Sequence, residues 1–298
     1  MGTQEQTAPR ARGLKAALRD FAELVAFSHT VFLFPFALAA VLLAHRVRPV
    51  TPARLAWIVL ALVAARTAAM VMNRIADRRF DAENPRTQNR PLVTGRVTPA
   101  QAWSYLALAC AVFILACWRL GPLCLMLSPL ALAWVLGYSF SKRFTSLSHL
   151  WLGSATALAP LGAWIGVTGS FDWRILVLAA AVSLWVAGFD VIYACQDLGF
   201  DRRRGLCSLP ARLGLGRALW VSRGLHLGAW SGFVALAPLF HLGRVYLVGA
   251  LALGALLALE QALVAAKKAN IPMAFFTVNG VVSVLFFLVL ALDLYWET

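Results

Sequence analysis

Charged residues are scarce in this sequence: they make up 13% of the 298 residues, whereas 61% of the residues are hydrophobic. A soluble domain has about a quarter charged residues and is about half apolar. Charge is absent altogether from 175–189 and 245–259, among other stretches. This composition excludes an ordinary soluble domain. It predicts an all-α protein that crosses the lipid bilayer several times.

Cysteine is also rare, with five residues that show neither a CxxC nor a Cys/His spacing. We therefore expect no disulfide and no structural zinc. A signal-peptide pattern is missing too, because residues 2–20 are polar and basic and no small-residue cleavage pattern follows. The sequence predicts a basic N-terminal tail, 1–20, and a single transmembrane domain, 21–298.

Apolar windows of about 20 residues match the hydrocarbon thickness of a bilayer. By this rule we predict nine transmembrane helices. The predicted spans are 22–44, 53–73, 99–118, 122–141, 149–168, 173–194, 216–239, 245–266 and 273–296.

Basic residues are unevenly distributed between the two ends of these spans. With the N-terminus on the cytoplasmic side, that side holds 20 of the 27 Lys and Arg residues and the opposite side holds 6. The positive-inside rule therefore predicts a multi-pass protein of the inner (cytoplasmic) membrane, with the N-terminus cytoplasmic and the C-terminus outside. The net charge of +14 comes from these short loops, so we expect no nucleic-acid partner.

Two similar motifs follow long apolar runs at an offset of 120 residues. Each motif has members at positions i, i+4 and i+8: Asn73, Asp77 and Asp81 in the first, and Tyr193, Asp197 and Asp201 in the second. Residues four apart share one face of a helix. Each motif thus presents two carboxylates, which are hard ligands suited to Mg²⁺ and its phosphate substrates. The constant offset also suggests two four-helix units followed by a ninth helix.

Several basic residues accompany the motifs. Arg66 lies inside a predicted span on the same helical stripe as Asn73, where a charge costs about 2.5–3.5 kcal/mol. It is predicted either to meet a phosphate or to form a structural pair. Arg86 and Arg90 follow the first motif in a polar, turn-forming stretch, and Lys142 with Arg143 ends another span. These residues are either ligands of an anionic substrate or topology signals.

Four segments together resemble the UbiA-type intramembrane aromatic prenyltransferases, in particular the 4-hydroxybenzoate polyprenyltransferase branch. They are the first motif with the Pro-Arg-Thr and Arg-Pro-Leu sequences at 85–92, Tyr138 to Thr145, the second motif, and Phe27 to Phe36 in the first span. The resemblance covers nearly the whole chain, and it implies that the nine helices surround a central cavity that opens to the cytoplasmic side. One departure is Arg74, where many members have an aspartate.

The resemblance implies a mechanism and a set of roles. Asp77 and Asp81 would hold one Mg²⁺, and Asp197 and Asp201 would hold another. Asn73, Arg66, Lys142, Arg143 and Arg90 would bind the diphosphate of a polyprenyl diphosphate. Arg66, Asp190 and Tyr193 would take part in transfer of the prenyl group to a small aromatic acceptor. Asp190 would orient or deprotonate the acceptor, or else be a buried acid paired with an arginine.

Other functions fit parts of the sequence. A membrane transporter also carries intramembrane charge, but transporters place their sites near the midplane, and here only Arg66 and Asp190 lie deeper than the cytoplasmic mouth. A scaffold without activity would lack metal ligands, yet all four aspartates are present. Prenylation of a dihydroxynaphthoate for menaquinone, or of haem or a lipid head group, remains an alternative within the enzyme class.

Overall fold

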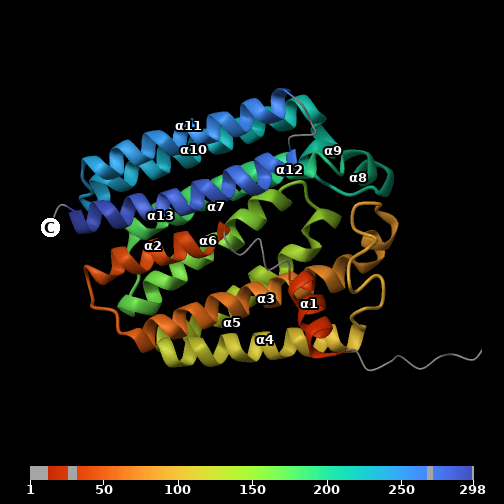
Figure 1. Ribbon diagram of the computed structural model, residues 1–298, viewed down its shortest axis with the longest axis horizontal. Coiled ribbons are helices and arrows are strands. Elements are labelled where there is room, and N and C mark those ends of the chain that lie inside the picture. Colours follow the sequence, from red (N-terminus) through yellow and green to blue (C-terminus); the bar gives the residue numbers. More distant parts are fainter. Residues whose placement is uncertain (1–12, 26–31, 267–270, 297–298) are drawn as a thin grey trace, which may run out of the picture.

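The computed structural model describes residues 13–25, 32–266 and 271–296, and this part of the chain is helical, with no strand. The long helices lie side by side (Figure 1). The first half contains α1 (Leu14–Leu24), α2 (Phe34–His45), α3 (Pro52–Glu83), α4 (Pro99–Leu120), α5 (Pro122–Gly137), the 3₁₀ helix η2 (Tyr138–Arg143) and α6 (Ser148–Thr168). The second half contains α7 (Trp173–Ala194), α8 (Leu198–Arg204), α9 (Leu209–Leu213), α10 (Leu215–Phe240), α11 (Arg244–Ala266), α12 (Ile271–Met273), the π helix η4 (Ala274–Val278) and α13 (Asn279–Trp296). The predicted all-α architecture is confirmed.

Seven helices in the described residues are long and apolar enough to cross a membrane. They correspond to α3, α4, α5 with η2, α6, α7, α11 and the segment 276–295. The predicted first span is different, because α1 ends at Leu24 and the short α2 begins at Phe34. The residues Phe27 to Thr30, which contributed to the family resemblance, lie outside the described residues.

Proline and threonine define where α3 and α4 begin. Pro52 and Pro99 occupy first-turn positions, where the missing N–H of proline costs nothing. Thr51 accepts a hydrogen bond from the backbone N–H of Arg54, and Thr98 forms a reciprocal capping box with Gln101. These local caps favour the observed start of each long apolar helix.

The larger apolar core surrounds α7, which packs against α6 on one side and α10 on the other. Phe36, Trp185, Phe233 and Phe286 from four helices meet there, with ring centroids 4.8–5.7 Å apart. Gly153 and Gly188 permit the close approach, since a Cβ at either would collide with the Ser183 carbonyl or the His226 ring.

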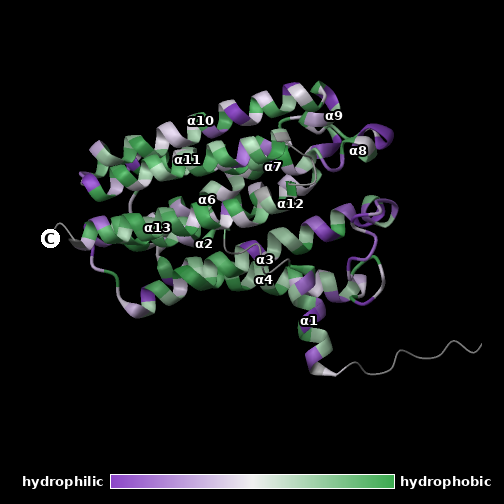
Figure 2. Ribbon diagram, turned by 45° about the horizontal axis from the view of Figure 1, so that its top comes forward, coloured by the Kyte–Doolittle hydropathy of each residue, from purple (hydrophilic) through white to green (hydrophobic). Residues whose placement is uncertain are grey.

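The polar residues gather at one end of the molecule. Figure 2 shows hydrophobic residues along the helices and hydrophilic ones around α8, α9 and the loop between α3 and α4. Both α3 and α7 end there, and the Asn84 side chain donates a hydrogen bond to Asp197 at 3.1 Å. The predicted placement of the two motifs at one end of the bundle is confirmed.

Two buried acids correct the prediction that only Arg66 and Asp190 lie deep in the helices. Glu260 on α11 is fully buried and accepts a hydrogen bond of 2.7 Å from Asn279. Asp293 on α13 accepts bonds from the backbone N–H groups of Gly243 and Tyr246, at 2.7 and 2.8 Å. Hydrogen bonds from distant segments stabilise these buried acids, and no local sequence pattern reveals such bonds.

Replacement of Asp293 by alanine is expected to destabilise the protein. Asp293 caps the first turn of α11 from another helix, and loss of a cap costs about 1–2 kcal/mol. Thermal unfolding in detergent should shift to lower temperature. Asp172→Ala removes the more exposed cap of α7 and serves as the matched comparison. Wild-type stability in Asp293→Ala would contradict this assignment.

Candidate active site

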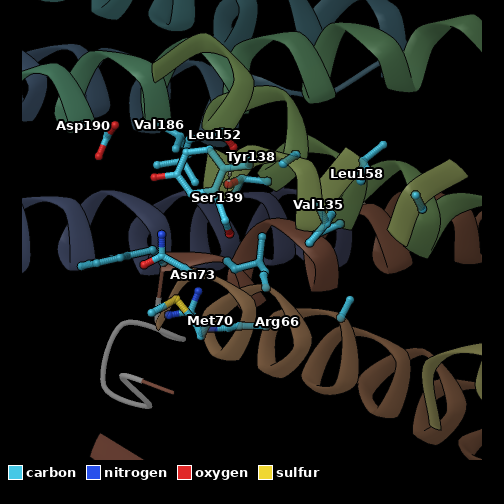
Figure 3. Close-up of a pocket in the computed structure, with 18 of the residues that line it drawn as sticks. Arg66, Met70, Asn73, Val135, Tyr138, Ser139, Leu152, Leu158, Val186 and Asp190 are labelled. Atoms are coloured by element: carbon cyan, nitrogen blue, oxygen red, sulfur yellow. Dashed lines mark hydrogen bonds between the residues drawn. The ribbon is translucent and has the colours of Figure 1, made fainter. Parts of the chain in front are cut away.

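A cavity of about 450 Å³ lies among α3, α5, η2, α6 and α7. Figure 3 shows Arg66 and Asn73 on one side of it and Asp190 on the other, with Tyr138 and Ser139 between them. Towards Ile58, Leu158 and Ile165 the lining is apolar. Every site residue predicted from the sequence lines this cavity: Arg66, Asn73, Asp77, Asp81, Arg90, Lys142, Arg143, Asp190, Tyr193, Asp197 and Asp201.

The first motif lies on the last turns of α3, as predicted. Asn73 donates a hydrogen bond to the Asp77 carboxylate one turn later, at 3.0 Å. Asp81 is buried, and Arg90 contacts both of its oxygens at 2.6 Å. The uninterrupted helix therefore directs the two carboxylates to the same side.

The second motif does not lie on one helix, contrary to the prediction. The helix α7 ends at Ala194, and three successive i→i−3 hydrogen bonds carry the chain to Asp197, where α8 begins. Tyr193 consequently belongs to α7, Asp197 occupies the N-cap position of α8, and Asp201 follows in its first turn. The i, i+4 relation survives only between the two aspartates. An aspartate such as Asp197 is a favourable N-cap residue and permits a new helix to start there, but it does not require one.

The loop between α3 and α4 joins the two motifs. Arg86 donates to both oxygens of Asp197, at 3.0 and 2.5 Å, and to the Tyr193 hydroxyl at 2.7 Å. Arg90, four residues later, contacts Asp81. A single polar turn thus places one guanidinium on each motif. The sequence left Arg86 open between a ligand of an anionic substrate and a topology signal, because its partner Asp197 lies 111 residues away.

Burial and charge act in opposite directions on the second pair of aspartates. Burial works to raise the pKa of Asp197, but its bonds to Arg86 and Asn84 hold that pKa below the usual value. Burial raises the pKa of Asp201, although the charge of Lys142 partly opposes the change. Neighbouring carboxylates repel each other, so this end of the cavity requires cations for both acids to be ionised.

Further cations line the cavity below and beside the motifs. Arg143 lies 3.6 Å from an Asp77 oxygen and donates to the Ala76 carbonyl at 2.6 Å. Arg66 lines the cavity two helical turns below Asn73 (Figure 3). Arg74, the position at which the sequence differs from the family pattern, is buried. Its side chain donates a hydrogen bond to the Leu24 carbonyl and so connects α3 to α1. The charge pattern suits an anion bound between Arg66 and the motifs.

Asp190 is paired with a histidine rather than with the arginine considered from the sequence. His149 Nδ1 lies 2.6 Å from Asp190 Oδ2, and both residues are buried. Tyr138 and Ser139 of η2 line the cavity beside them. Sequence reasoning did not select Ser139 or His149, since serine and histidine in an apolar span are ordinary structural residues. The Tyr138-Ser139 sequence in the family-like segment was the available signal.

The described residues contain no cluster of three or more His, Cys, Asp or Glu side chains that would form a complete metal site. The donor atoms present nevertheless suit a hard cation shared with a phosphate substrate. Two carboxylate pairs line one end of the cavity, and Asp201 Oδ2 is buried without a hydrogen-bond partner there. A buried unsatisfied carboxylate oxygen is costly unless a cation or donor completes it. The residues therefore fit Mg²⁺.

Comparison with known proteins identifies relatives along most of the chain. The 4-hydroxybenzoate octaprenyltransferase of Saccharophagus degradans is 34% identical over 236 residues, which are 79% of this chain and 78% of that protein. The enzyme of the same name from Salmonella paratyphi C is 32% identical over 247 residues, covering 81% and 84% of the two chains.

Solved structures share the fold. A UbiA homologue from Aeropyrum pernix K1, solved in its apo form, superposes with a TM-score of 0.81 and 36% identity, covering 89% of this chain and 98% of that one. A homologue from Archaeoglobus fulgidus, solved with DMAPP and Mg²⁺, gives a TM-score of 0.73 at 18% identity over 92% and 99% of the chains, which shows the fold alone. The sequence profile of the UbiA prenyltransferase family matches residues 33–290. The chain therefore belongs to the UbiA prenyltransferase family.

Proposed function

We propose that the protein is an integral membrane enzyme that transfers a polyprenyl group from a prenyl diphosphate to 4-hydroxybenzoate in quinone biosynthesis. The observation that carries this proposal is the meeting of two carboxylate pairs and several arginines at one end of an otherwise apolar cavity. The relatives named 4-hydroxybenzoate octaprenyltransferase, at 34% and 32% identity, support this choice of acceptor. A transporter would not require paired metal ligands at the cavity end.

Mg²⁺ is the proposed cofactor, held by Asp77 with Asp81 and by Asp197 with Asp201. Bound there, it would neutralise the charge that develops on the departing diphosphate. Asn73 would complete the coordination of the ion held by Asp77 and Asp81. Arg66, Lys142, Arg143 and Arg90 line the same cavity and would donate hydrogen bonds to the diphosphate oxygens.

Transfer would break the allylic C–O bond, with its electron pair leaving on the diphosphate, and would form a bond from that carbon to the ring carbon ortho to the phenolic hydroxyl. The ring proton would then pass to the released diphosphate. Asp190 would hold the acceptor, and Tyr193 would lie between it and the diphosphate site. The apolar walls around Ile58, Leu158 and Ile165 would enclose the prenyl tail and exclude water from the reacting carbon.

The proposed membrane arrangement has nine transmembrane helices, in which α10 and the predicted first span, which includes α2, are added to the seven apolar spans. The cavity would open to the cytoplasm and the N-terminus would lie on that side, with the C-terminus outside, in the inner membrane. Residues 1–20 would form a basic tail and residues 21–298 a single transmembrane domain. The helix α1 runs from Leu14 to Leu24 and so crosses that boundary.

Membranes containing the protein should release diphosphate and form a prenylated ring only when a prenyl diphosphate, 4-hydroxybenzoate and Mg²⁺ are all present. The assay compares several prenyl chain lengths and includes dihydroxynaphthoates as the competing acceptors. If only a dihydroxynaphthoate is prenylated and 4-hydroxybenzoate is not, the enzyme would instead belong to menaquinone synthesis. The absence of diphosphate release with every acceptor would overturn the proposal and favour a transport function.

A further inference from the structure

His149, the second residue of α6, lies behind the cavity wall between α7 and α9. It is fully buried, and both ring nitrogens have partners. Nδ1 lies 2.6 Å from Asp190 Oδ2, and Nε2 lies 3.3 Å from the backbone nitrogen of Leu209. A buried histidine with two directed contacts is held in one orientation, unlike a histidine that only fills space.

The two contacts assign the roles of the ring nitrogens. The backbone nitrogen of Leu209 carries a hydrogen and can only donate, so Nε2 accepts. The proton of the neutral ring is therefore on Nδ1, which donates to the Asp190 carboxylate. His149 consequently fixes one carboxylate oxygen of Asp190.

The second carboxylate oxygen of Asp190 can accept a hydrogen bond from a ligand in the cavity. Asp190 lines the cavity with Tyr138 and Ser139, and among the described residues no side chain or backbone group bonds its Oδ1. A carboxylate held at one oxygen and open at the other can receive a hydrogen bond from a ligand hydroxyl in a fixed direction. The carboxylate can thus act as a directional acceptor for a phenol.

We propose that His149 is the positioning residue for the aromatic acceptor: it orients Asp190 so that the free oxygen of Asp190 receives the phenolic hydroxyl. This inference rests on the proposed function. It goes further by naming the residue that sets acceptor geometry from outside the cavity, and by separating acceptor binding from diphosphate binding.

The orientation of His149 depends in turn on the segment that follows the second motif. The Cys207 backbone donates to the Lys142 carbonyl at 2.7 Å, and Arg212 donates to the Ser146 hydroxyl at 3.2 Å. These bonds hold the segment around α9 against η2 and the start of α6, where Leu209 reaches the His149 ring. The acceptor site and Asp201 therefore share one short, fixed segment of chain.

The test is steady-state kinetics of purified protein in detergent, with the acceptor and the prenyl diphosphate varied separately. His149→Leu removes the donor and should raise the KM for 4-hydroxybenzoate and lower kcat/KM for it by about tenfold or more. The KM for the prenyl diphosphate should stay within about twofold of wild type. His149→Asn places an N–H donor at the position of Nδ1 and should restore most of the acceptor KM.

Two further variants separate positioning from packing. His226→Leu removes another buried histidine that contacts α7, 3.7 Å from the carboxylate of Glu260, and it should leave both KM values unchanged. In the double variant with both Asp190→Asn and His149→Leu, the His149→Leu change should add little to the loss of kcat/KM that Asp190→Asn causes alone, because His149 acts through Asp190.

The outcomes distinguish the two proposals. An active wild-type enzyme in which His149→Leu keeps the acceptor KM, or in which both KM values rise together, would overturn the positioning role alone. Fully additive losses in the double variant would also overturn it. A wild-type protein that prenylates no aromatic acceptor would overturn the proposed function, and the positioning role with it.

Discussion

Replacement of either Asp77 or Asp197 by asparagine is expected to lower kcat for prenyl transfer by about 100-fold or more. The two residues lie 120 positions apart in the chain and on different helices, yet both line the same end of the cavity. An amide keeps the shape of the carboxylate but removes its charge and weakens its hold on a divalent cation. The measurement is transfer of radiolabelled prenyl groups at saturating substrate and magnesium.

Glu83→Gln is the matched control for these variants. Glu83 ends the same helix α3 and forms an ion pair with Arg204, but that pair is exposed and lies outside the cavity lining. Exposed ion pairs contribute about 0–1 kcal/mol, so this variant should keep nearly full activity. Expression and membrane insertion should match wild type in all three proteins. Full activity in either aspartate variant would refute the metal assignment.

Chelation of magnesium is expected to abolish turnover, and added Mg²⁺ should restore it. Without a divalent cation, the carboxylates at the cavity end would face a diphosphate of the same sign, which is unfavourable even with Arg86 and Arg90 on Asp197 and Asp81. The measurement is initial rate against Mg²⁺ concentration after treatment with EDTA.

Potassium at the same ionic strength is the control for this experiment. It screens the carboxylates to a similar degree but does not hold two phosphate oxygens in a fixed geometry. Recovery of the rate with K⁺ alone would mean that the aspartates need only general charge screening. A rate unaffected by EDTA would exclude magnesium as the cofactor.

The helices and the position of the site follow largely from local features of the sequence. Apolar runs of about 20 residues, with Pro52 and Pro99 after threonine caps, predict where α3 and α4 begin. The spacing of Asn73, Asp77 and Asp81 on one uninterrupted helix is likewise a local property. The site residues chosen from these motifs and from the family resemblance all line one cavity.

The remaining features depend on contacts between distant segments. The contact of Arg86 with Asp197 exists only because the α3–α4 loop folds over the end of α7. The break after Ala194 is a tertiary outcome, since the same residues are compatible with a continuous helix. Glu260 and His149 look like isolated polar residues in apolar runs until Asn279 and Asp190 are placed beside them.

The close approach of α7 to its neighbours has a consequence for directed evolution of the acceptor range. Side chains added at Gly153 or Gly188 would collide with Ser183 or His226, so a mutational library placed there would mostly return unfolded protein. Val135, Ser139 and Leu152 line the cavity from α5, η2 and α6. Substitutions at those three positions can change which acceptors fit the cavity while the packing of α7 against its neighbours stays intact.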